Sequence, residues 1–89
     1  EPCLPDKPTA EVVDTPMLSF VEGAPRGTVT VEGDVDPTGR VVKTKITSNT
    51  TGSEAAAAVA RSELERMRFA PPVRRCQPVR FIYVYTRNF

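Results

Sequence analysis

Cys3 and Cys76 are the residues of this 89-residue chain whose chemistry the sequence predicts most directly. Two cysteines without a single histidine cannot complete a four-ligand zinc site, so we predict no metal and no cofactor. A disulfide between Cys3 and Cys76 would tie the N-terminus to the domain and would indicate an oxidising compartment. A redox-active thiol is the alternative, because Arg74 and Arg75 would favour the thiolate form of Cys76.

The acidic residues offer little that could support catalysis. Acid–base catalysis uses a histidine or carboxylates gathered at one site, whereas most acids here lie in the N-terminal part of the chain. Glu63 and Glu65 are two residues apart on a predicted helix, so they do not face each other, and we expect both to be solvated. We therefore predict that the protein is not an enzyme.

Charge is distributed unevenly, although the net charge is only +1. Residues 1–36 contain eight acids and two basic residues, whereas residues 61–89 contain seven arginines and two acids. Either the two ends lie close together and partly neutralise each other, or the arginines form a basic face for an acidic partner. No RNA-binding aromatic motif or recognition helix accompanies the arginines, so we predict no nucleic-acid partner. No apolar run approaches the roughly 20 residues of a membrane helix.

A β-hairpin is the clearest element that the sequence predicts, over residues 27–46. Val29, Val31 and Val35 alternate along its first strand and would share one buried face. The turn Asp36-Pro37-Thr38-Gly39 has proline to preset φ, an aspartate that can bond to the turn backbone, and a glycine for positive φ. A return strand follows from Val41 to about Ser48.

An amphipathic helix should follow the hairpin, capped either by Thr51 with Glu54 or by Ser53 alone. We expect it to end near Arg68, since Pro71 and Pro72 cannot continue it. Its apolar stripe recurs at three- and four-residue spacing and contains Ala56, Val59, Ala60, Leu64 and Met67. Arg61, Glu65 and Arg68 lie on the opposite side.

The two ends of the chain complete the expected organisation into an arm, residues 1–16, and a domain, residues 17–89. Four prolines make the arm loop-like, and Glu11–Val13 is its only candidate for an edge strand. Residues 17–21 form either a helical turn or a strand. The strongest strand by propensity is the last one, residues 78–86. Its two faces both carry apolar side chains, which suggests contact with something outside the core.

The ordered set of these motifs resembles the C-terminal domain of TonB, the periplasmic energy transducer of Gram-negative bacteria. That family has a strand of alternating valines, a Pro-x-Gly hairpin followed by Arg-Val, an amphipathic helix, an aromatic-proline stop and a Pro-Val opening of the last strand. The matching positions here, over about residues 15–86, are Gly27, Val29, Val31, Val35, Pro37-Thr38-Gly39-Arg40-Val41, Thr51-Gly52, Arg68-Phe69-Ala70-Pro71 and Gln77-Pro78-Val79. The chain departs from the family at Thr15-Pro16, Gly33, Met67 and Cys76, the last replacing a turn glycine.

The resemblance implies a small α+β fold in which one helix packs on one face of an antiparallel sheet of β-β-α-β order. It also implies a periplasmic, non-enzymatic protein-binding domain whose last strand pairs with a partner peptide, such as the box of an outer-membrane transporter. The binding residues would be Val79, Arg80, Phe81, Ile82, Tyr83, Val84 and Tyr85. Arg80 and Arg87 would steer an acidic peptide.

A second hypothesis is a stand-alone exported domain that has a structural or assembly role in the cell envelope. Strand-edge pairing between two copies could then produce a homodimer. No anchor helix or proline-rich rod precedes the domain in this chain. Either an upstream part is missing from the chain, or a small exported protein reuses the fold without energy transduction.

Overall fold

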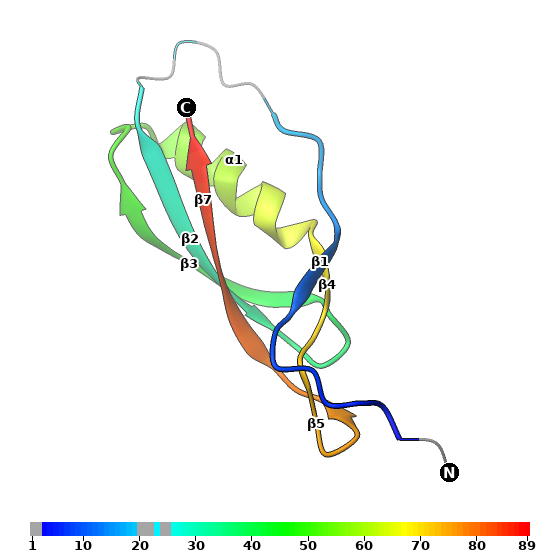
Figure 1. The fold of residues 1–89 in the computed structure, drawn as a ribbon. Helices are drawn as coiled ribbons and strands as arrows, with labels where there is room; N and C mark the ends of the chain where they lie inside the picture. The colour runs from blue at the N-terminus through cyan, green and yellow to red at the C-terminus, as the bar shows by residue number, and fades with distance from the viewer. Residues whose placement is uncertain (1–2, 20–22, 24–25) are drawn as a thin grey trace.

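A three-stranded antiparallel sheet and one helix form the centre of the molecule in a computed structural model that describes residues 3–19, 23 and 26–89. Strand β2 (Thr28–Val35) lies in the middle, with β3 (Val41–Asn49) on one side and β7 (Phe81–Asn88) on the other. Helix α1 (Glu54–Glu65) packs on one face of this sheet (Figure 1). The predicted small α+β fold is therefore confirmed.

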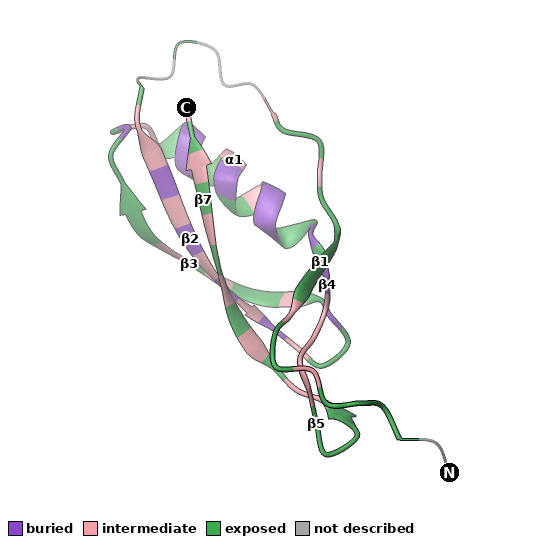
Figure 2. Cartoon of the chain, viewed as in Figure 1, coloured by how far each residue is buried: buried purple, intermediate pink, exposed green. Residues whose placement is uncertain are grey.

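The core lies between α1 and β2, as the alternating valines predicted. Val29, Val31 and Val35 are at most 1% exposed and meet the buried side of the helix, so that the purple segments of Figure 2 face each other. Gly33 continues the valine face, but a Cβ there would lie 3.0 Å from a Leu64 methyl carbon. The missing side chain at Gly33 thus makes room for the largest apolar residue of the helix.

The hairpin turn has the structure that its residues predicted. The Asp36 carboxylate accepts hydrogen bonds from the backbone N–H and the hydroxyl of Thr38 and from the N–H of Arg40. The hydrogen bond from the Thr38 hydroxyl is the main reason why the pKa of Asp36 is lowered. Gly39 has a φ of 89°, and its backbone lies so close to the Phe69 carbonyl that a Cβ would collide with it. The turn therefore also fixes the position of the segment after the helix.

The helix is capped by one of the two predicted caps, Ser53, but it ends earlier than predicted. The Ser53 hydroxyl accepts a hydrogen bond from the Ala56 N–H at 3.2 Å, so Ser53 is the N-cap. The last helical residue is Glu65, and the prediction of an end near Arg68 was wrong. The chain leaves the helix because residues 68–70 form a strand, β4 (Arg68–Ala70), which pairs with the N-terminal arm.

Short strands join the N-terminal arm to the segment between α1 and β7. The candidate edge strand of the arm is present as β1 (Glu11–Asp14) and pairs antiparallel with β4. A small hairpin of β5 (Val73–Arg74) and β6 (Gln77–Pro78) follows. Residues 17–19 have no regular secondary structure, and the rest of the predicted element, Phe20 and Val21, lies outside the described residues.

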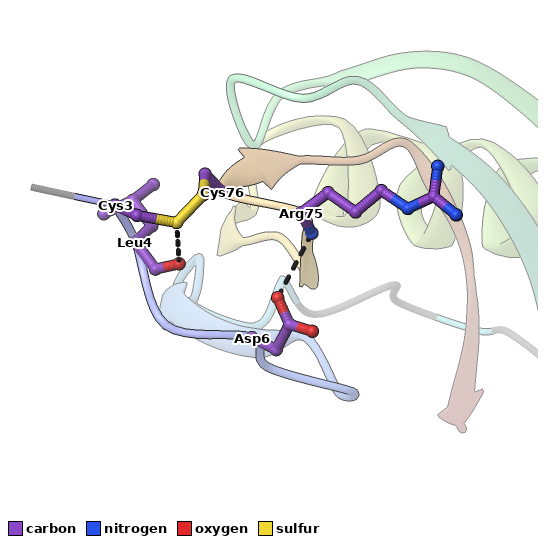
Figure 3. Close-up of a disulfide and its surroundings, with 5 residues drawn as sticks. All are labelled: Cys3, Leu4, Asp6, Arg75 and Cys76. Carbon is purple, nitrogen blue, oxygen red and sulfur yellow. Dashed lines mark hydrogen bonds between the residues drawn. A yellow bond between two sulfur atoms is a disulfide. The ribbon is translucent and has the colours of Figure 1, made fainter. Parts of the chain in front are cut away.

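The predicted disulfide between Cys3 and Cys76 is present, and it leaves no free cysteine (Figure 3). Its Cα atoms are 4.9 Å apart. Nearby, the Asp6 carboxylate accepts a hydrogen bond from the Arg75 N–H at 3.1 Å, and Lys7 exchanges two backbone hydrogen bonds with Val73. The arm is thus joined to the β5–β6 hairpin by covalent and by hydrogen bonds. A disulfide is typical of proteins in an oxidising environment.

The turn that carries Cys76 has an unusual backbone. Arg75 and Cys76 both have positive φ, 50° and 70°, in the two-residue connection between β5 and β6. Such hairpins require this left-handed conformation, which glycine adopts most easily. Cys76 therefore occupies a left-handed position, and its side chain forms the disulfide from there.

Candidate functional site

Strand β7 is an edge strand of the central sheet. It pairs with β2 along its whole length in a continuous antiparallel register, in which Val31 faces Tyr85. Among residues 3–19, 23 and 26–89, no strand pairs with the other side of β7. An edge of this kind presents unpaired backbone N–H and C=O groups that can accept a further strand.

The hydrogen bonds at the end of β7 define which of its backbone groups point outward. Gly27 and Phe89 exchange both of their backbone hydrogen bonds, at 2.8 and 3.5 Å. Because hydrogen-bonded and non-hydrogen-bonded pairs alternate in an antiparallel ladder, every second residue back from Phe89 also bonds to β2. The residues between them direct their N–H and C=O toward the open edge, namely Ile82, Val84, Thr86 and Asn88.

The side chains of β7 alternate between the two faces of the sheet. Phe81, Tyr83, Tyr85 and Arg87 are half-buried on the helix side, whereas the residues between them are exposed (Figure 2). Ile82 and Val84 are 62% and 55% exposed. The open edge therefore combines outward backbone groups with exposed β-branched apolar side chains.

The predicted binding residues do not all belong to this edge. Val79 and Arg80 precede the strand, which begins at Phe81 and not at Pro78 as predicted. The Val79 N–H is already bonded to the Pro72 carbonyl at 2.9 Å. Arg80 is exposed and lines an open groove of about 410 Å³ next to the hairpin turn. The predicted strand ended at Thr86, whereas β7 continues to Asn88, an edge residue that the prediction missed.

The opposite edge of the sheet, on β3, is less suited to pairing. Its register with β2 is interrupted twice, between Thr30 and Val31 and between Asp34 and Val35. Lys43 and Lys45 lie on β3, opposite Asp34 and Glu32. Irregular register and lysines are features by which proteins protect sheet edges from further strands. The two edges of this sheet therefore differ, and β7 is the unprotected one.

A buried carboxylate next to β7 was missed by the sequence analysis. Glu63, expected to be solvated, is only 1% exposed, whereas Glu65 is exposed. The Glu63 carboxylate accepts hydrogen bonds from the Tyr85 hydroxyl and from the Ser19 N–H, both at 2.8 Å. The helical pattern was informative in one respect, because Glu63 precedes Leu64 on the buried side of α1. Only the fold could place its partners there.

Arg87, which was predicted to steer an acidic peptide together with Arg80, is the cation that accompanies this carboxylate. Its side chain is 13% exposed, and its Nε lies 3.2 Å from Oε1 of Glu63. This contact is an ion pair without hydrogen-bond geometry, since Nε has no hydrogen-bond partner within the described residues. One terminal nitrogen donates to the Ser19 carbonyl at 2.6 Å, and the guanidinium lies over the Phe89 ring.

These contacts predict how stability should depend on alkaline pH. Burial and the hydrogen bond to Glu63 raise the pKa of Tyr85 from 10.0 to about 12. The stabilising contribution of neutral Tyr85 is therefore fully present below about pH 10, and it is lost as the pH rises from about 10 toward about 12. Unfolding free energies measured across this range should fall more steeply for the wild type than for Tyr85→Phe. Equal slopes would contradict the assignment.

Comparison with known proteins adds no functional information, because neither a family model nor a curated protein matches this chain. The resemblance to the TonB C-terminal domain therefore stays a prediction. Within the described part of the chain, no helix has the length and apolar character needed to cross a membrane. What the fold and the site define, over the described residues, is a small α+β domain whose central sheet has an unprotected edge on β7.

Proposed function

We propose that this chain is a non-enzymatic binding module of the periplasm, similar to the C-terminal domain of TonB, that captures an extended peptide on the open edge of β7. The observation that carries the proposal is the edge of β7 to which no described residue adds a strand, with outward backbone groups at four alternate residues. The added strand would gain affinity from main-chain hydrogen bonds and selectivity from its alternate side chains. The box peptide of an outer-membrane transporter is the partner that the resemblance implies.

The chemistry of the edge favours a partner with β-branched apolar residues on one face. Ile82 and Val84 are the exposed neighbours that such residues would contact on the solvent side of the sheet. Arg80 is exposed just before the strand and would attract an acidic residue near one end of the peptide. Arg87 is excluded from this role because it is engaged with Glu63.

A proline at Val84 should prevent binding without unfolding the sheet. Val84→Pro removes an N–H that points to the open edge, and proline is tolerated on edge strands in that orientation. A transporter box peptide titrated into wild-type protein should shift the backbone amide resonances of β7, and these shifts should be lost in Val84→Pro. Val84→Thr, which keeps the N–H and the branched side chain, is the matched control. Absence of shifts along β7 in the wild type would refute the proposal.

The alternative function is a structural domain that associates with its own kind through the same edge. The specific observation in its favour is that residues 81–86 of β7 contain no charged side chain, so two copies could pair antiparallel without repulsion. Sedimentation of wild-type protein and Val84→Pro distinguishes the two functions. A dimer that Val84→Pro converts to monomer would support self-association, and a monomer in both would support capture of a peptide.

A further inference from the structure

Glu63 and Arg87 together hold Ser19, which follows the N-terminal arm, by its backbone. The Ser19 N–H donates to Oε2 of Glu63 at 2.8 Å, and the Ser19 carbonyl accepts from Arg87 at 2.6 Å. The N–H and the C=O of a single residue are thus bound by a carboxylate and a guanidinium. Hydrogen bonds to charged groups are about twice as strong as neutral ones. This clamp recognises a peptide backbone and not the identity of a side chain.

The clamp lies beside the open edge of the sheet. Helix α1 packs mainly against β2 and β3 and only slightly against β7. The helix side of β7 is therefore left for the segment that follows the arm, which approaches the C-terminal end of β7 where Ser19 meets Arg87. A strand added to β7 would run about 4.8 Å from it. At this end its helix-side side chains would enter the space beside Arg87, where Ser19 lies.

The segment that ends at Ser19 is attached here by its backbone and hardly by its side chains. Met17 and Leu18, the residues before Ser19, are 90% and 62% exposed, although both are apolar. Segments that bury little apolar surface open at a low cost in free energy. The stretch of residues 15–19 is therefore held by the two hydrogen bonds at Ser19 more than by packing.

We propose that residues 15–19 act as a strap that regulates peptide binding at β7. The strap occupies the clamp of Glu63 and Arg87 in the free protein, and a peptide that pairs along the C-terminal half of β7 displaces it. The inference rests on the proposed function, since it regulates the same edge. Only molecules with an open strap can bind the peptide. The apparent affinity of the edge is therefore its intrinsic affinity multiplied by the fraction of molecules in which the strap is open.

Proline at Ser19 tests the strap without altering β7 or α1. Ser19→Pro removes the N–H that donates to Glu63, whereas Ser19→Ala keeps the backbone and serves as the matched control. The heteronuclear NOE of the Leu18 amide should fall in Ser19→Pro relative to Ser19→Ala. The peptide of the titration above should bind Ser19→Pro about tenfold more tightly, which corresponds to the loss of one such hydrogen bond.

Each result decides between the possibilities. A lower NOE at Leu18 with tighter binding supports the strap. An unchanged NOE shows that the bond to Glu63 does not hold the strap and overturns the inference, and so does equal affinity in the two variants. In both of these cases, binding at β7 still supports the proposed function. Absence of β7 shifts in the wild type and in both variants overturns the function and the strap together.

Discussion

Replacing Glu63 with alanine is expected to lower the free energy of unfolding by about 3–5 kcal/mol. This cost is typical when one partner of a buried ion pair is removed and the other stays buried. Among the described residues, Glu63 is the only acid that forms an ion pair with Arg87, whose side chain is 13% exposed. The substitution removes this acid. It also removes the acceptor of the Tyr85 hydroxyl and of the Ser19 N–H. Urea denaturation followed by circular dichroism measures the change.

Two further variants isolate the cause of this loss. Glu65→Ala alters an exposed carboxylate two residues away on the same helix and should change stability by less than about 0.5 kcal/mol. Glu63→Gln keeps an acceptor for Tyr85 but removes the charge, so its loss should lie between those of the two alanine variants. If Glu63→Ala and Glu65→Ala were equally stable, the buried cluster would have no energetic importance.

Removing the disulfide should have an effect of similar size. The bond joins residues separated by 73 positions, and a loop of that length corresponds to about 4 kcal/mol in the chain-entropy model. The double variant Cys3→Ser with Cys76→Ser should therefore unfold at a much lower urea concentration than the oxidised protein. Wild-type protein in reductant should behave like the double variant. A difference below about 1 kcal/mol would contradict the prediction.

The left-handed turn provides a matched control for the disulfide experiment. Serine at position 76 must keep the φ of 70° that the cysteine has, whereas glycine adopts it without strain. The variant with Cys3→Ser and Cys76→Gly should therefore be more stable than the double serine variant by roughly 1 kcal/mol. The difference between the wild type and the double serine variant measures the lost covalent bond, because the left-handed turn is present in both. The additional stability of the glycine variant measures what a non-glycine residue costs in this turn.

The elements that the sequence predicted well are those whose signals are local. The alternating valines, the Asp36–Gly39 turn and the Ser53 cap depend on residues a few positions apart, and all are present in the structure. The disulfide was predictable because only two cysteines exist. An open edge on the last strand was expected only from the resemblance to the TonB C-terminal domain. The exact residues of the edge were not predicted, because the start of β7 depends on the Val79–Pro72 hydrogen bond.

The features that could not be predicted depend on contacts between distant residues. Glu63 can be buried because Tyr85 and Ser19 donate hydrogen bonds to its carboxylate and Arg87 forms an ion pair with it. These partners lie 22 to 44 positions away in the chain. A carboxylate on a helix is solvated unless such partners exist, so local periodicity alone favours the wrong answer. The helix ended early for a similar reason, since β4 pairs with β1 from the arm.

The disulfide also has a topological consequence for the strand that the proposed function uses. Residues 3–76 form a covalently closed ring that contains β2, β3 and α1, whereas β7 follows the ring in the chain. A movement of β7 away from β2 would therefore leave the ring closed. The disulfide thus restricts the segment from Cys3 to Cys76 and leaves β7 outside the cross-linked part of the chain.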